Sequence, residues 1–268
     1  MRVRFWGVRG SVPWATSSSI GYGCNTPCVE IRNERTGAVL VLDAGSGIVG
    51  LGEALGSEPR AIPILLTHYH WDHLQGLPFF SQFYQAGLTA TIWAPQLERV
   101  DLAWLETIFQ QPFFPVPIEA LPSRPAMALV PPRETVIGGF RIHSQRLSHP
   151  GGAFAYRIQG DTGDVVYATD HEFGDRAVDL CLAEFCKDAA AVILDAHFTP
   201  EELPSRKGWG HGTWKQCAEF ARASGARHLW LFHHKPGRTD EELAAIEAQA
   251  REVFPATTAA GEGDNFEV

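Results

Sequence analysis

The stretch LTHYHWDHLQG concentrates residue types that bind metal ions. It holds His68, His70, Asp72 and His73 within six positions, directly after the apolar run AIPILL. His68 and His70 are two positions apart, so on an extended backbone their side chains project from the same side. Imidazoles and carboxylates suit zinc, and also manganese or iron. Since four ligands exceed what one open zinc site needs from one loop, we expect two ions that share it.

Other potential ligands stand where apolar runs end. A polar group at the end of each predicted strand indicates that one edge of the fold carries a site, although each residue alone would be explained by chance placement in a loop. These residues are Asp43, His68, His149, Asp170 and His233.

The elements that must position these residues are predicted from periodicity. Strands are expected at 2–6, 28–32, 38–43, 61–68, 89–95, 140–149, 189–199 and 227–233. Residues 154–170 are expected to form a hairpin around GDTGD. Helices are expected at 46–56, 76–87, 97–110, 212–226 and 239–254. The last helix has a capping box of Thr239 and Glu242.

Length and composition fit one large globular unit. Apolar residues make up 45% and charged residues 20% of the 268, which is an ordinary balance, and we predict a single domain over 1–268. The segment 98–132 contains the proline-rich stretch 112–132, which cannot be one regular element. We expect this segment to be an insert, and the sequence leaves open whether it is a lid, a dimer contact or a substrate-selecting element.

Charge and apolar patterning exclude several classes of function. A net charge of -9 argues against binding long nucleic acid, although a local basic pocket could still hold a small phosphate. No apolar run is long enough for a membrane span, and the N-terminal residues lack the apolar core of a secretion signal. Five cysteines match no zinc-binding spacing. We therefore expect a cytoplasmic protein with reduced thiols.

The motifs resemble those of the metallo-β-lactamase-fold hydrolases. HYHWDH matches the HxHxDH signature, and LSHPGG, YATD and LFHH match its downstream landmarks. GWGHGT is similar to the GHST-type motif of the phosphodiesterase branch, which includes ribonuclease Z and small cyclic-phosphate diesterases. Gly212 stands where that branch usually has serine, although Thr213 can still cap the following helix. The resemblance implies an α/β fold, a four-layer αββα sandwich.

The resemblance also implies a ligand set for two divalent metal ions. His68, His70 and His149 would hold one ion, Asp72, His73 and His233 the other, and Asp170 would bridge them. His234 could take the place of His233. We favour His233 as the ligand, because it comes first after the strand. Zn²⁺ fits the histidines best, and the carboxylates also accept Mn²⁺ or Fe²⁺.

The remaining candidates surround this set. His211, with Asp72, is the expected catalytic residue, since it could stabilise charge or protonate the leaving group. Asp43 would orient a ligand imidazole or, alternatively, cap the helix at 46–56. Possible phosphate-binding residues are Arg9, Arg206, Lys207 and Lys235.

The resemblance favours a two-metal phosphodiesterase that hydrolyses a small or cyclic phosphodiester, such as a cyclic nucleotide or a sugar cyclic phosphate, through a metal-bridging hydroxide. A ribonuclease Z is the alternative, but the segment between His149 and Asp170 is too short for the tRNA-gripping arm of bacterial forms. Lactone or thioester hydrolysis on the same metal core is disfavoured by GHGT. A non-catalytic metal-binding module is disfavoured by the complete ligand set. The expected partner is a small-molecule substrate, and a homodimer is compatible with the family.

Overall fold

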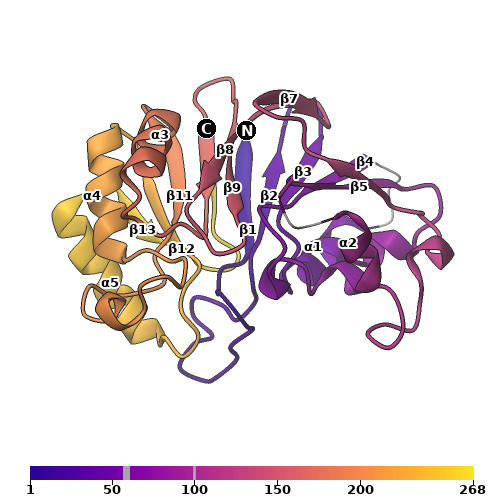
Figure 1. The fold of residues 1–268 in the computed structure, drawn as a ribbon, viewed down its shortest axis with the longest axis horizontal. Coiled ribbons are helices and arrows are strands. Elements are labelled where there is room, and N and C mark those ends of the chain that lie inside the picture. Colours follow the sequence, from indigo (N-terminus) through magenta and orange to yellow (C-terminus); the bar gives the residue numbers. More distant parts are fainter. Residues whose placement is uncertain (57–60, 99–100) are drawn as a thin grey trace.

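The computed structural model describes residues 1–56, 61–98 and 101–268. In this part of the chain, two seven-stranded sheets face each other (Figure 1). The first sheet has the order β14 (Asn265–Glu267), β1 (Arg2–Gly7), β2 (Cys28–Arg32), β3 (Val39–Leu42), β4 (Ala61–Leu65), β5 (Thr89–Ala94), β6 (Ala126–Leu129). The second has the order β13 (Thr257–Ala259), β12 (Leu229–Phe232), β11 (Ala191–Asp195), β10 (Val165–Ala168), β9 (Ala153–Ile158), β8 (Phe140–Leu147), β7 (Glu134–Ile137).

Helices cover the outer faces of both sheets (Figure 1). The first sheet packs against α1 (Ile48–Leu55) and α2 (Ala103–Thr107). The second packs against α3 (Arg176–Cys186), α4 (Trp214–Ser224) and α5 (Asp240–Val253). The predicted four-layer αββα sandwich is therefore confirmed.

The core between the sheets is aromatic and aliphatic. The ring of Phe5 on β1 lies 5.0 Å from that of Trp230 and 5.8 Å from that of Phe232, so the two sheets interlock through large side chains. Each such side chain contributes about 1.5–3 kcal/mol when it leaves water. The strand expected at 2–6 is present as β1, in which every second side chain is buried.

Parallel strands precede most of the strand-end residues of the site, the exception being the antiparallel β8 before His149. β3 to β6 run parallel in the first sheet and β10 to β13 in the second, while the remaining pairs are antiparallel. The carboxyl ends of parallel strands meet at one edge, where α/β proteins bind their ligands. The predicted hairpin is confirmed as the antiparallel pair β9 and β10.

Most predicted helices are confirmed, with two corrections. Residues 76–87 form two short 3₁₀ turns, η2 (Leu77–Phe79) and η3 (Ser81–Tyr84), because Pro78 sits in the first turn and Phe80 is extended. The helix expected at 97–110 is reduced to α2, and Arg99 and Val100 of that prediction lie outside the described residues. Sequence reasoning missed α3, although Asp175 caps its first turn.

The segment predicted as an insert contributes structure of its own. Besides α2 it holds η4 (Ile118–Ala120) and β6, which adds an edge strand parallel to β5. None of the helices in the described ranges combines the length and the apolarity needed to cross a membrane.

The capping box of α5 predicts a measurable loss of stability. Thr239 accepts a hydrogen bond from the Glu242 amide, and Glu242 accepts one from the Thr239 amide. Thr239→Ala should lower the free energy of unfolding by about 1 kcal/mol, because an amide of the first turn loses its partner. Urea unfolding should show a lower midpoint at constant slope. Thr162→Ala, in the exposed hairpin turn, is the control, and an equal effect in both variants would contradict the capping role.

Candidate metal centre

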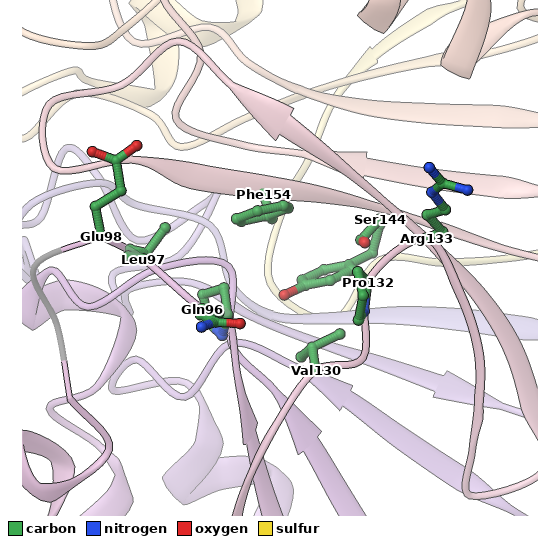
Figure 2. A pocket seen from close by; sticks show the side chains of 10 residues that line it. Gln96, Leu97, Glu98, Val130, Pro132, Arg133, Ser144 and Phe154 are labelled. Carbon is green, nitrogen blue, oxygen red and sulfur yellow. The ribbon is translucent and has the colours of Figure 1, made fainter.

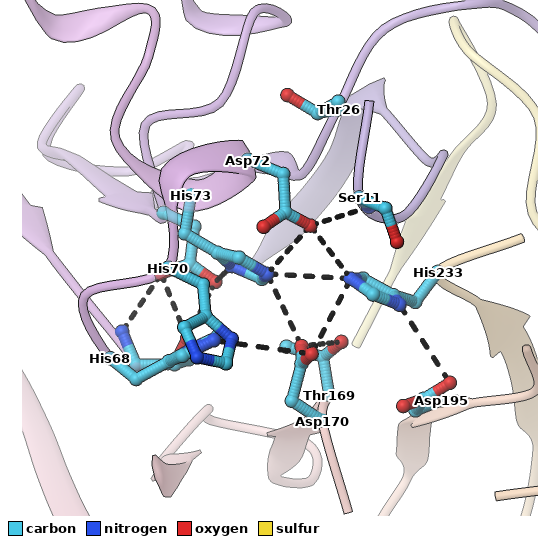
Figure 3. Close-up of polar contacts among 12 residues, drawn as sticks. Ser11, Thr26, His68, His70, Asp72, His73, Thr169, Asp170, Asp195 and His233 are labelled. Atoms are coloured by element: carbon cyan, nitrogen blue, oxygen red, sulfur yellow. Dashed lines mark hydrogen bonds and ion pairs between the residues drawn. The ribbon is translucent and has the colours of Figure 1, made fainter. Parts of the chain in front are cut away.

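The structure brings the predicted residues together at one edge of the sandwich (Figure 3). Asp43 follows β3, and His68 begins the ligand-rich part of residues 66–76, here called the metal loop, after β4. His149, Asp170 and His233 follow β8, β10 and β12. Both sheets therefore contribute to one cluster, as the recurring strand-end pattern predicted.

Three of these residues turn the chain through a left-handed conformation. Asp43, Asp170 and His233 have φ values of 58°, 61° and 58°. Such angles are uncommon outside glycine and cost about 1–3 kcal/mol each unless the surroundings fix them. The turns aim each side chain back into the cluster, which is a feature that strand prediction does not reveal.

The ligand atoms separate into two groups of three. His68, His70 and His149 form one group, and each offers a ring nitrogen within 4.8 Å of the others. His149 Nε2 lies 3.0 Å from His70 Nδ1. These residues are the set proposed for the first ion.

The second group consists of Asp72, His73 and His233, whose ligand atoms meet the same 4.8 Å limit. His233 Nε2 lies 3.1 Å from Asp72 Oδ2 and 3.4 Å from His73 Nε2. Spacings of this size between facing donor atoms suit ligands that converge on one cation. This set is the one proposed for the second ion.

Asp170 lies between the two groups. Its Oδ2 is 3.2 Å from His73 Nε2, and its Oδ1 is 3.5 Å from His233 Nε2 in the second group. The same Oδ1 is 3.8 Å from His149 Nε2 and 4.0 Å from His68 Nε2 in the first group. The carboxylate therefore has the position that a bridging ligand requires.

The unsatisfied atoms of the cluster fit a metal site. His68 Nε2 and His233 Nδ1 are buried without a hydrogen-bond partner among the described residues. Orphaned buried nitrogens are rare in native proteins. His68 Nε2 lies 4.0 Å from Asp170 Oδ1 and can serve a cation there, whereas His233 Nδ1 faces Asp195 Oδ1 at 3.8 Å. Histidine nitrogens and carboxylate oxygens match the donor set of zinc and of similar divalent ions, so the residues present fit two such cations.

Protonation states agree with this fit. Burial lowers the pKa values of His68, His70 and His149, which leaves these imidazoles neutral and able to donate a lone pair. Burial opposes ionisation of Asp170, yet the facing imidazoles of His233, His73 and His68 hold its pKa well below the usual value. Burial also opposes a charge on His73, but Asp72, Asp43 and Asp170 raise its pKa well above the usual value. The carboxylates thus favour positive charge at this position, and a cation bound at His73 Nε2 would replace the proton there.

Asp43 orients His73 and does not cap α1. Its Oδ2 accepts from His73 Nδ1 at 2.8 Å and from the Tyr167 hydroxyl at 2.8 Å, and Thr67 donates to both carboxylate oxygens. The N-cap of α1 is Gly47, and no side chain caps this helix, so the capping alternative is wrong. A carboxylate behind a ligand imidazole fixes its tautomer and its ring orientation.

His211 lies at the border of the cluster, held by Asp195. Its Nδ1 is 2.6 Å from Asp195 Oδ2 and 3.6 Å from Asp170 Oδ1. Burial opposes the charge, but the Asp195 carboxylate raises the pKa of His211 to about 9. The ring of His197 stacks on that of His211, with centroids 4.4 Å apart, and its Nδ1 bonds to the carbonyl of His233.

Contacts from distant loops fix the rest of the site. The Ser11 amide donates to Asp72 Oδ2 at 2.7 Å, so the glycine-rich loop after β1 reaches the metal loop. Glu172 accepts from the amides of Gly208 and Gly210. The Gly210 carbonyl in turn bonds to His149 Nδ1 at 2.8 Å, so Glu172 positions both His149 and the turn before His211.

The structure gives the basic candidates other partners. Arg9 is fully buried and donates to the carbonyls of Gly23, Ser19 and Arg238, so its role as a phosphate clamp is wrong. Lys235 Nζ pairs with Glu202 at 2.6 Å, and Arg206 lies over the ring of Trp209, 5.0 Å from its centroid. Lys207 is exposed to solvent.

Two histidines beside predicted ligands face elsewhere. His234 bonds through Nε2 to the Ala260 carbonyl, away from the cluster, which favours His233 as the proposed ligand. His171 joins the Ser148 amide to Asp179 and so braces the turn before His149.

Sequence motifs revealed the residues whose types bind metals and one supporting residue, Asp43, but not the other residues that support the site. Tyr167, Glu172 and the Ser11 amide were missed, since a strand tyrosine, a loop glutamate and a backbone amide have no pattern that marks them.

A cavity of about 450 Å³ lies between β8, β9 and the loops after β5 and β6, and none of the predicted site residues lines it (Figure 2).

Comparisons with known proteins agree with this geometry. A ribonuclease Z of Bradyrhizobium sp. (strain ORS 278) is 26% identical over 276 residues, which cover 87% of this chain and 91% of that protein. The metallo-beta-lactamase fold protein YhfI from Bacillus subtilis has a similar structure, with a TM-score of 0.75, 19% identity and 99% of both chains covered. A diphosphatase from the PhnP family has a TM-score of 0.73 at 18% identity, covering 100% of this chain and 97% of that one.

The family assignment rests on a match to a described protein family over most of the chain. Residues 39–234 match the family described as the beta-lactamase superfamily domain, and this range includes Asp43, the metal loop and His233. The chain therefore belongs to the beta-lactamase superfamily domain family and is a metal-dependent hydrolase of the metallo-β-lactamase fold.

Proposed function

We propose that this protein is a two-metal phosphodiesterase whose substrates are small or cyclic phosphodiesters. The observation that carries the proposal is the pair of three-residue donor groups on either side of Asp170, with His211 beside them. Likeness to ribonuclease Z, whose name denotes cleavage of RNA, supports phosphodiester hydrolysis as the class of reaction.

His68, His70 and His149 would hold one ion, Asp72, His73 and His233 the other, and Asp170 would contact both. Two divalent cations about 3.5–4 Å apart supply an activated water and neutralise charge on both oxygens of an in-line displacement. The neutral state of His68, His70 and His149 leaves their lone pairs available for this task.

His211 would stabilise and protonate the leaving oxygen. Asp195 binds its Nδ1 at 2.6 Å and keeps the ring protonated at neutral pH, so Nε2 remains as a donor. A positioned imidazolium can stabilise developing charge and pass a proton to a leaving alkoxide. A phosphodiester and a lactone both release an alkoxide, whereas a thioester releases a thiolate, so His211 disfavours only the thioester. The likeness to ribonuclease Z is what favours a phosphodiester over a lactone.

Processing of precursor tRNA is the second candidate, because curated relatives include ribonuclease Z. The hairpin of β9 and β10 spans His149 to Asp170, which leaves no room for a tRNA-gripping arm at that point. The net charge of -9 would also repel a polyanion. Both observations support a small substrate over tRNA.

A substrate panel tests the reaction class. We expect the metal-loaded protein to hydrolyse bis-p-nitrophenyl phosphate and at least one cyclic phosphodiester, chosen from 2′,3′- and 3′,5′-cyclic nucleotides and ribosyl cyclic phosphate. Precursor tRNA and an acyl-homoserine lactone complete the panel. Cleavage of the lactone without any phosphodiester would refute the proposal, and preferential cleavage of tRNA would replace it with the second candidate.

Asp170→Ala should lose the paired metal site, because no other carboxylate in the described residues lies between the two donor groups. The metal content after dialysis, measured by elemental analysis, should fall below two ions per chain. Asp161→Ala, an exposed carboxylate in the hairpin turn, is the matched control. Two ions retained in Asp170→Ala, with a native circular dichroism spectrum, would contradict the bridging assignment.

His211→Ala should retain both ions while kcat on bis-p-nitrophenyl phosphate falls by about 10²–10⁴. The physical reason is the loss of a proton donor held by Asp195. His143→Ala, on β8 and bonded to Gln159, serves as a remote histidine control. If His211→Ala loses metal, the residue is a ligand and the proton-donor role is excluded.

A further inference from the structure

An apolar cavity of about 520 Å³ opens beside the metal loop. One wall comes from the loop itself through Tyr69, Trp71 and Leu74. The opposite wall comes from α2 and the turn after it, through Trp104, Ile108 and Phe113. Its volume falls within the range of small-molecule sites, roughly 300–1,000 Å³. We call this cavity the aromatic pocket.

The rings of the aromatic pocket are left unusually exposed. Trp71, Trp104 and Phe113 are 55%, 59% and 73% exposed. Neighbouring rings are packed: Phe114 meets Phe79 edge to face at 5.5 Å and Phe109 at 6.4 Å, which fixes the turn that carries Phe113. Exposed apolar side chains that gather around a cavity mark a binding surface.

The wall is continuous with the proposed metal site. Trp71 lies between His70 and Asp72, and consecutive Cα atoms are about 3.8 Å apart. The loop is held as a tight turn, because the amides of Leu74 and Gln75 donate to the Trp71 carbonyl. His70, which precedes Trp71, is itself exposed to solvent. A ligand in the pocket and a group at the metal centre can therefore belong to one small molecule.

The chemistry of the walls selects a planar, uncharged group. Among the residues that the structure describes, no carboxylate, ammonium, guanidinium or imidazole lines the cavity. The Tyr69 hydroxyl donates to the Pro95 carbonyl and so has its polar partner within the protein. Aromatic side chains stack on any nucleobase, because every base has a π-face. Loss of one such stacking contact weakens binding by about 5- to 100-fold.

We propose that the aromatic pocket binds the base of a small nucleoside phosphodiester whose phosphate lies at the metal centre, an inference that rests on the proposed function. The segment 98–132 then acts as a substrate-selecting element, since it supplies Trp104 and Phe113. Sugar phosphates without a base leave the pocket empty and are poorer substrates.

A matched substrate pair tests this proposal. Adenosine 2′,3′-cyclic phosphate and methyl ribofuranoside 2′,3′-cyclic phosphate share the scissile bond and differ in the base. The wild-type enzyme should favour the nucleoside by about 5- to 100-fold in kcat/KM, mostly through KM. Trp104→Ala and Phe113→Ala should each reduce this preference, whereas Leu180→Ala, an exposed apolar residue on α3, should retain it. Equal preference in wild type and both pocket variants would overturn the proposal.

Two further measurements distinguish a failure of the pocket assignment from a failure of the proposed function. Calorimetric titration with AMP and ribose 5-phosphate measures base binding without turnover, and AMP should bind more tightly in a manner that depends on Trp104. If no phosphodiester is cleaved but this dependence holds, the proposed function fails and the pocket assignment stands. If Trp104→Ala changes the oligomeric state in sedimentation and leaves the base preference intact, the face is a contact with a second copy and the proposal is wrong.

Discussion

The site depends on one electrostatic constraint, the burial of an ionised carboxylate. Asp170 is almost inaccessible to water, and a buried charge without a partner costs several kcal/mol. Five imidazoles lie within 4.0 Å of its oxygens and come from both sheets, namely those of His68, His73, His149, His211 and His233. Each chain turn that delivers a ligand must therefore end at the same edge of the sandwich. The left-handed backbone at Asp43, Asp170 and His233 is the local cost of that convergence.

The same constraint organises the supporting residues. Asp43 holds His73, Asp195 holds His211, and Glu172 holds the turn that contacts His149. Asp43 and Asp195 contact the rings directly, and Glu172 acts on His149 through the Gly210 backbone, so the donor groups are arranged before a cation binds. The metal loop also carries Trp71, which lines the aromatic pocket together with residues of α2. The same short loop thus supplies proposed metal ligands and an apolar wall.

Much of the fold and of the donor set could be predicted from the sequence, since apolar periodicity marks strands and HYHWDH marks a metal loop. His234 and His233 are adjacent in sequence, yet only their turn geometry shows which one faces the cluster. Arg9 has a side chain that could bind phosphate, but its guanidinium donates to three backbone carbonyls instead. Residues 76–87 have helical spacing, but Pro78 and an extended Phe80 divide them. Tertiary partners, which local patterns do not encode, decide these cases.

Anomalous diffraction from crystals grown with zinc tests the central claim most directly. The account predicts two peaks about 3.5–4 Å apart, with Asp170 between them, one next to His68, His70 and His149 and the other next to Asp72, His73 and His233. The residues Asp195, His197, His211 and His233 form another group whose ligand atoms converge. A single peak within that group, with no density beside Asp170, would contradict the two-metal centre.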